Sequence, residues 1–213
     1  MPASTFKIPN SLIGLESGAI PDSNYVIKWD GKPGFIKEWD RDHTLKSAIT
    51  FSVVWYYQEL ARRVGRKKMQ YWLNKINYGN NTIGDKLDYF WLDNSLKISA
   101  NEQVEFLKKF YQGNLPFSKR SLDITKSILP EDDYKNAVLK FKTGTGKYED
   151  GHYVAWLVGY LVKVQSSKDK GQNEEVNNVY FFAFNVEAIN FKDAVELRSK
   201  IKSRMLEYLG VSH

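Results

Sequence analysis

The spacing of apolar residues changes near residue 130 of this chain. Before that point apolar side chains recur at intervals of three and four residues, as on the buried face of a helix. After it, runs of Val, Phe, Tyr and Trp indicate three strands, at 137–142, 153–162 and 179–186. Their short separations favour an antiparallel meander, whose long and charged second connection predicts a surface loop. A helical period returns over 192–209, before Gly210.

Capping and stop residues mark the ends of the earlier helices. The first helix ends at Gly18, and Pro9 within it should distort its second turn. Ser99 and Glu102 form a capping box, which indicates a helix start. The predicted helices before the sheet cover 4–17, a short segment from Asp42 or Thr44 to Ile49, about 55–64, 66–76, 99–112 and 118–129. The segments 19–43 and 82–98 are predicted to be irregular.

These elements predict an α+β fold, in which helices cover an antiparallel sheet beside an all-helical lobe. We expect a single domain over 1–213, with the helical lobe at about 19–130 and the sheet with its terminal helix at about 137–210. Three strands make a thin sheet for a core of this size, and they would leave a long edge unpaired.

Composition excludes several classes of function. The chain has no cysteine, so disulfides, thiolate metal sites and thiol catalysis are ruled out. The three histidines lack metal-ligand spacing, and we predict no metal site. No apolar run approaches the roughly 18 residues that span a membrane, and no signal peptide is recognisable.

The net charge of +6 raises the alternative of a basic binding module. The densest basic cluster is 62–68, at a junction between two predicted helices. Elsewhere lysine and arginine alternate with acidic residues, so we interpret the excess as a solvated rim and predict no nucleic-acid binding. A basic surface equally suits small anionic substrates.

The tetrad Ser-x-x-Lys occurs three times, as Ser4/Lys7, Ser167/Lys170 and Ser199/Lys202. A serine needs a base to remove its proton, and a lysine three residues on lies on the same helical face. That lysine must be neutral or modified, and apolar neighbours lower a lysine pKa. Only Lys7 has an apolar helical face around it, whereas the other two pairs fall in a charged loop and a charged helix. Alone, a capping serine beside a solvated lysine remains the better interpretation.

Two further motifs suit the same chemistry. Lys142-Thr143-Gly144 ends the first predicted strand, where a cation and a hydroxyl suit a carboxylate and glycine permits close backbone approach. Ser52-Val53-Val54 places a hydroxyl on a loop between helices, where it can relay a proton. Each motif has an ordinary alternative, a strand-to-turn junction or a helix cap, that is favoured when the motif is taken alone.

Taken together and in this order, the motifs resemble those of the penicillin-recognising serine acyltransferases. The longer segments 2–13, Tyr78-Gly79-Asn80 and Phe90-Trp91-Leu92-Asp93 resemble the class D, or oxacillinase-type, serine β-lactamases over essentially the whole chain. The resemblance implies a β-lactamase/transpeptidase-like fold and a periplasmic or secreted enzyme that hydrolyses β-lactams. In that family the reactive serine follows N-terminal strands, so we expect a chain without those strands to fold poorly or to act weakly.

The resemblance also implies roles for matching positions. Ser4 would attack the lactam carbonyl, and Lys7 would be N-carboxylated by carbon dioxide to act as base, with no other cofactor. Trp91 would hydrogen-bond the carbamate, while Val54 and Leu92 would exclude water. The remaining implied roles are proton transfer by Ser52, an oxyanion hole from the amides of Ser4 and Thr145, and substrate binding by Lys142, Thr143, Gly144 and Arg198. A sensor domain or a penicillin-binding protein, which stay acylated, is the alternative.

Overall fold

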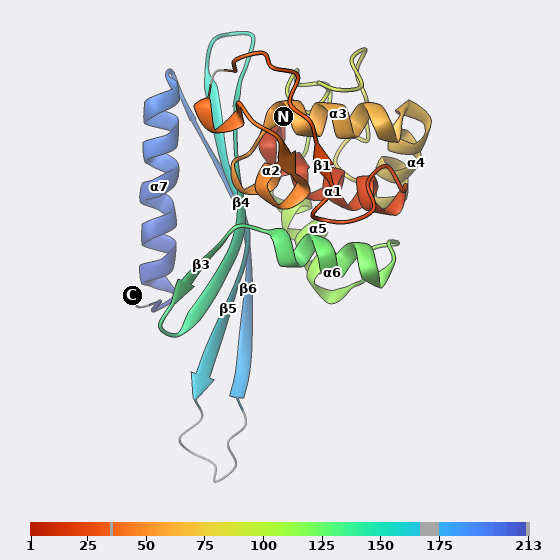
Figure 1. The fold of residues 1–213 in the computed structure, drawn as a ribbon. Helices are drawn as coiled ribbons and strands as arrows, with labels where there is room; N and C mark the ends of the chain where they lie inside the picture. The colour runs from red at the N-terminus through yellow and green to blue at the C-terminus, as the bar shows by residue number, and fades with distance from the viewer. Residues whose placement is uncertain (35, 167–174, 212–213) are drawn as a thin grey trace.

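The computed structural model describes residues 1–34, 36–166 and 175–211, excepting the side chains of 164–166 and 175–177. Its centre is an antiparallel sheet, with one C-terminal helix on one face and the remaining helices on the other (Figure 1). The main core lies between the sheet and the larger helical layer, and a smaller core lies under the C-terminal helix. This is the α+β arrangement that the sequence predicts.

The helices agree closely with the capping signals. The structure has η1 (Ala3–Phe6), α1 (Lys7–Glu16), η2 (Lys37–Trp39), α2 (Leu45–Thr50), α3 (Val54–Val64), α4 (Arg66–Ile76), α5 (Ala100–Gln112), α6 (Lys119–Ile128) and α7 (Phe191–Tyr208). Thr44 and Ser99 close capping boxes at α2 and α5, and Ser118 caps α6. Each cap satisfies backbone N–H groups that have no partner inside the helix.

The first helix differs from the prediction in one informative way. It opens as the 3-10 turn η1 and becomes α-helical only at Lys7. Pro9 therefore lies in the first turn of α1, where a backbone N–H has no helical partner in any case. The change of helix type thus accommodates the proline without the predicted distortion of a second α-helical turn.

The main sheet has the order β3-β4-β5-β6, with every neighbouring pair antiparallel. The strands are β3 (Glu131–Tyr134), β4 (Ala137–Lys147), β5 (Tyr153–Ser166) and β6 (Glu175–Ala188). The three-strand prediction was therefore wrong: β3 was missed, because its sequence is charged as edge strands often are. The other three strands are longer than predicted, and β4 continues through Lys142-Thr143-Gly144 instead of ending there.

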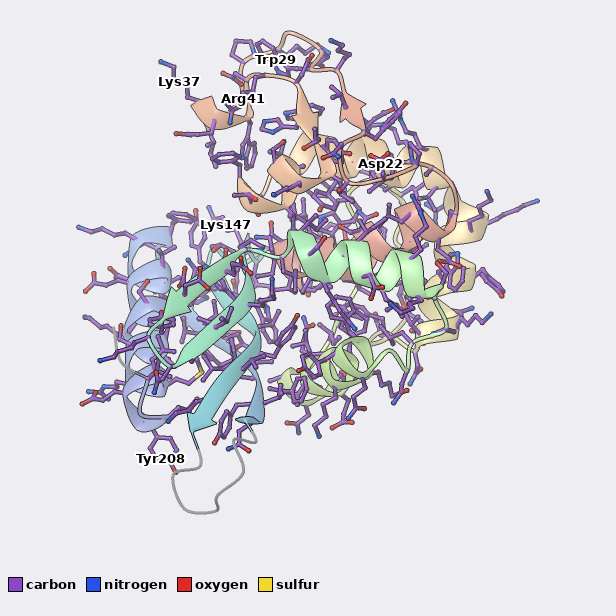
Figure 2. The ribbon with its side chains drawn as sticks, turned by 60° about the horizontal axis from the view of Figure 1, so that its bottom comes forward. Asp22, Trp29, Lys37, Arg41, Lys147 and Tyr208 are labelled. Atoms are coloured by element: carbon purple, nitrogen blue, oxygen red, sulfur yellow. The ribbon has the colours of Figure 1, made fainter. Side chains whose placement is uncertain are left out.

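A second, small sheet pairs β1 (Val26–Ile27) with β2 (His43–Thr44), inside a segment predicted to be irregular. Trp29, Lys37 and Arg41 lie on the part of this segment that projects beside the helical layer (Figure 2). In the described part of the chain, β6 has a neighbouring strand on one side only. No helix among the described residues is both long and apolar enough to cross a bilayer.

Candidate active site

Ser4 and Lys7 meet at the junction of η1 and α1. Lys7 Nζ donates a hydrogen bond to Ser4 Oγ at 2.7 Å, as expected for residues one turn apart. Both residues are buried, and Lys7 is only 1% exposed. The predicted nucleophile and the predicted base are therefore in direct contact.

The surroundings of Lys7 disfavour its charged form. Burial, and secondarily the charge of Lys142, hold the pKa of Lys7 well below its usual value of 10.5. The face of the Tyr57 ring lies 5.3 Å from Nζ. Tyr57 is fixed in turn by a 2.9 Å hydrogen bond to Ser11 Oγ, which donates to the Lys7 carbonyl oxygen. A neutral amine in this position can take the hydroxyl proton of Ser4.

Lys142 on β4 is a second lysine with a buried side chain, 2% exposed. Burial, with a smaller effect from the Arg198 charge, lowers its pKa to about 7. Its ammonium donates to the Thr143 carbonyl oxygen at 3.0 Å. In the described part of the chain neither Lys142 nor Lys7 has an ion-pair partner. The site therefore holds two amines and no compensating carboxylate, an arrangement that suits an anionic ligand.

Gly144 brings β4 against the backbone of the nucleophile turn. A Cβ at this position would lie 3.0 Å from Pro2 O, Ser4 N and Thr5 N. A side chain here would displace that backbone by a few tenths of an ångström, so glycine suits this contact. The predicted close approach of Gly144 to a substrate stays a prediction. Successive residues of a strand alternate between its faces, so Lys142 shares with Gly144 the face toward η1.

Thr143 and Thr145 lie on the opposite face of β4, toward α7. Arg198 of α7 donates from Nη1 to Thr145 Oγ1 at 3.2 Å. Burial lowers the pKa of Arg198 from its usual value. The predicted carboxylate-binding residues thus come from both faces of β4 and from α7, and the charge of Arg198 is near enough to act on Lys142.

Ser52 occupies the bend between α2 and α3, with a left-handed φ of +56°. That conformation is uncommon for a residue other than glycine. Among the described residues, no hydrogen bond joins Ser52 to Ser4 or to Lys7. The half-buried Val54 begins α3 immediately after this bend. The structure therefore places Ser52 on a strained loop, without a hydrogen bond to the nucleophile among the described residues.

Comparison with known proteins identifies the family of this arrangement. The penicillin binding protein transpeptidase domain family matches residues 1–168. β-Lactamase OXA-10 of Pseudomonas aeruginosa is 41% identical over 213 residues, covering 99% of this chain and 75% of that protein. The chain belongs to the class D β-lactamase family.

Solved structures agree with this assignment. A class D β-lactamase from Nostoc, YbXI, superposes with a TM-score of 0.87 at 38% identity, over 99% of this chain and 83% of that one. The C-terminal domain of the Bacillus licheniformis BlaR penicillin receptor superposes with a TM-score of 0.86 at 32% identity, over 98% of this chain and 79% of the other. The fold of class D enzymes is thus shared with a receptor.

The two remaining segments that resemble class D enzymes, 78–80 and 90–93, lie close together in the structure. Trp91 is buried and stacks on Phe6 with ring centroids 5.5 Å apart, and its carbonyl accepts the Ala3 N–H at 3.1 Å. Within the described residues, its indole N–H has no hydrogen-bond partner. Leu92 beside it is half-buried and packs against the main core. Asn80, of Tyr78-Gly79-Asn80, forms 2.9 Å hydrogen bonds with Ser95 O and Lys97 N, which follow this segment in the chain.

Sequence reasoning missed two residues of the site. Tyr57 gave no signal beyond its place on an amphipathic helix. Gln103 looked like an ordinary helical residue after the α5 capping box, yet it is 1% exposed and contacts Thr5 beside the nucleophile. A buried glutamine at an apolar position of a helix would have been the available clue. Among the described residues no cluster of metal-ligating side chains occurs, and Ser167 lies outside them.

Proposed function

We propose that the protein hydrolyses the β-lactam amide of penicillin-type antibiotics through an acyl-enzyme on Ser4, and so gives resistance to them. The observation that carries this proposal is the 2.7 Å contact between Ser4 Oγ and a lysine whose charge is disfavoured by burial. Family membership supports the substrate class. It also supports action in the periplasm or outside the cell.

Acylation would follow from the groups around Ser4. The hydroxyl proton passes to Lys7 as Oγ attacks the lactam carbonyl carbon, and the amides of Ser4 and Thr145 stabilise the oxyanion. The C–N bond then breaks as Ser52 passes its proton to the departing nitrogen and takes up in turn the proton that Lys7 received from Ser4. Lys142, Thr143 and Arg198 hold the substrate carboxylate, to which their charges and hydroxyl are suited. Water then attacks the ester carbonyl as the base at Lys7 takes one of its protons, and that proton passes to Ser4 Oγ as the acyl C–O bond breaks.

The surroundings of Lys7 also fit N-carboxylation by carbon dioxide. A neutral buried amine is the form that can react, and Lys142 supplies the nearby cation that a carbamate would need. Carboxylation would supply an anionic base for hydrolysis of the ester. The unengaged indole N–H of Trp91 is available as a donor to it, with Val54 and Leu92 limiting water.

A rapid-mixing experiment with a chromogenic cephalosporin tests this function. Continuous turnover, with a rate that rises on addition of bicarbonate, is expected of the proposed enzyme. The similarity to the BlaR receptor domain makes a sensor the second candidate. A single stoichiometric burst followed by no further reaction would favour that sensor, or a penicillin-binding protein, and would overturn the hydrolase proposal. Absence of both turnover and a burst would overturn acylation itself.

A further inference from the structure

A chain of buried hydrogen bonds ends at the turn that carries Ser4. The Tyr78 hydroxyl donates to Gln103 Oε1 at 3.2 Å, and Gln103 Nε2 donates to Thr5 Oγ1 at 2.9 Å. The Thr5 hydroxyl donates in turn to the Pro2 carbonyl oxygen at 2.7 Å. Donors and acceptors alternate along the whole chain, so each bond polarises the next in the same direction.

The three side chains of this network come from three separate segments. Thr5 belongs to η1, Tyr78 follows α4, and Gln103 lies on α5, 98 residues from Thr5 in sequence. Each is 1% exposed. Water cannot replace a lost partner at such a site, so removing the Gln103 amide would leave buried polar atoms unsatisfied.

The turn held by the network is strained. Ala3, which directly precedes the nucleophile, has a left-handed φ of +50°. A side chain with a Cβ disfavours this conformation by about 1–2 kcal/mol. Such a conformation persists only where the surroundings enforce it. Here the enforcing contacts are the Ala3 N–H bond to Trp91 O and the two bonds from Thr5, through N and Oγ1, to Pro2 O.

The same turn sets the direction of the reactive groups. The amides of Ser4 and Thr5 lie against Gly144 of β4, and Ser4 Oγ lies against Lys7 Nζ. A relaxation of the turn toward ordinary backbone angles would rotate both the hydroxyl and the Ser4 N–H. Among the described residues Gln103 has no hydrogen bond to the nucleophile or the base, and its side chain is bonded to this turn through Thr5.

We propose that Gln103 is a positioning residue, which acts through Thr5 to hold the strained Pro2–Thr5 turn in the geometry that acylation of Ser4 requires. This inference rests on the proposed acylation of Ser4 and deepens it. The amide of Gln103 is the link between α5 and the turn, and Tyr78 fixes the orientation of that amide. The network is expected to affect the rate of acylation more than the affinity for the β-lactam.

The experiment uses the full chain, three single variants of the network and the double variant Thr5→Val/Gln103→Met. Thr5→Val and Gln103→Met remove the hydrogen-bonding groups at nearly unchanged shape, and Thr5→Ser keeps the hydroxyl. Phe110→Leu, on the same helix but outside the network, is the control for loss of stability. Stopped flow with a fluorescent penicillin separates the dissociation constant of the first complex from the acylation rate. Amide hydrogen exchange at Ser4 and Thr5 is measured without any β-lactam.

We expect Thr5→Val and Gln103→Met to acylate about 10²-fold more slowly, the loss typical of a misplaced reacting group. The dissociation constant should change little, the Ser4 and Thr5 amides should exchange faster, and Thr5→Ser should regain most of the rate. The acylation rate of the double variant should be no lower than that of either single variant, because both substitutions break the same link.

Wild-type acylation rates in both single variants would overturn the proposal. So would a loss of rate no larger than that of Phe110→Leu when the melting temperatures are equal. If the wild-type chain itself were not acylated, the proposed function would fail, and unchanged exchange at the turn would separately overturn the positioning role.

Discussion

Two serine–lysine pairs of identical spacing lie on helices at opposite faces of the sheet, and their surroundings differ in every respect that matters for chemistry. In the first pair, Lys7 is buried and its Nζ contacts Ser4 Oγ. In the second, the Ser199 hydroxyl donates to the Val195 carbonyl oxygen of its own helix at 2.9 Å. Lys202 instead turns to the sheet, where it forms an ion pair with Asp132.

The difference teaches that a motif acquires chemistry from the elements packed around it. The Ser4/Lys7 pair is covered by β4, by the Trp91 segment and by the larger helical layer, so water cannot stabilise an ammonium there. The Ser199/Lys202 pair lies on α7, where an acidic neighbour satisfies the lysine. Tyr208 at the end of the same helix points into solvent (Figure 2).

Removal of each serine is the strongest way to break this comparison. Ser4→Ala should abolish acylation by a fluorescent penicillin and lower kcat on the order of 10⁶-fold, as loss of a nucleophilic serine does. Ser199→Ala should leave both unchanged, because its hydroxyl only contacts the helix backbone. Labelled protein after electrophoresis and steady-state turnover measure the two effects. Labelling of Ser4→Ala at the wild-type level would show that the nucleophile lies elsewhere.

Replacing the lysines should give opposite effects on activity and stability. Lys7→Met should lower kcat by about 10²–10⁴-fold, the usual contribution of a general base. It should not lower the melting temperature, because it removes a buried amine without a carboxylate partner. Lys202→Met should keep full activity. Loss of the ion pair with Asp132 should lower its free energy of unfolding by no more than about 1 kcal/mol. Equal activity in the two variants would contradict the assignment of Lys7 as base.

Most of the helical layer could be predicted from local signals. The boundaries of α4, α5 and α6 follow from Gly65, the Ser99–Glu102 capping box and Ser118, whose effects act within a single turn. The extent of β4 beyond Lys142 could not be predicted, because strand pairing with β5 overrides the local preference of Gly144 and Gly146 for turns.

The composition of the site was predictable, but its supports were not. The motifs containing Ser4, Lys7 and Lys142 carry recognisable patterns at fixed spacing. Tyr57 and Gln103 reach the site through tertiary packing alone, over separations that no local rule covers. The left-handed angles at Ala3 and Ser52 were equally hidden, since neither residue type favours them.

A difference in the pH dependence of stability should sharpen the contrast between buried and surface lysines. The pKa of Lys142 is about 7 in the folded protein and near 10.5 in an unfolded chain, so between these values the unfolded state binds more protons. Stability contributed by this group therefore rises with pH, by up to about 1.4 kcal/mol per pH unit, and is lost as pH falls toward 7.

Denaturant unfolding at pH 7.5 and pH 9.5 measures this effect. Between these two pH values the free energy of unfolding of the wild-type chain should rise by about 2–3 kcal/mol more than that of Lys142→Met. Lys140→Met is the matched control on the same strand, since Lys140 forms a surface ion pair with Glu131. That control should follow the wild-type curve. An equal change in the free energy of unfolding with pH in the wild type and Lys142→Met would contradict a lowered pKa for the buried Lys142.

The smallest predicted effect concerns backbone strain, and it should change sign between the two regions. Ser52 has a φ of +56°, which costs alanine more than glycine, so Ser52→Gly should be about 1 kcal/mol more stable than Ser52→Ala. Ser199 lies inside the regular helix α7, where alanine should be more stable than glycine by a similar amount. Thermal melts of the four variants measure both differences. Alanine and glycine both lack a hydroxyl, so the difference between them reports the backbone conformation alone. A higher melting temperature for the alanine variant at both positions would show that the bend at Ser52 is not strained.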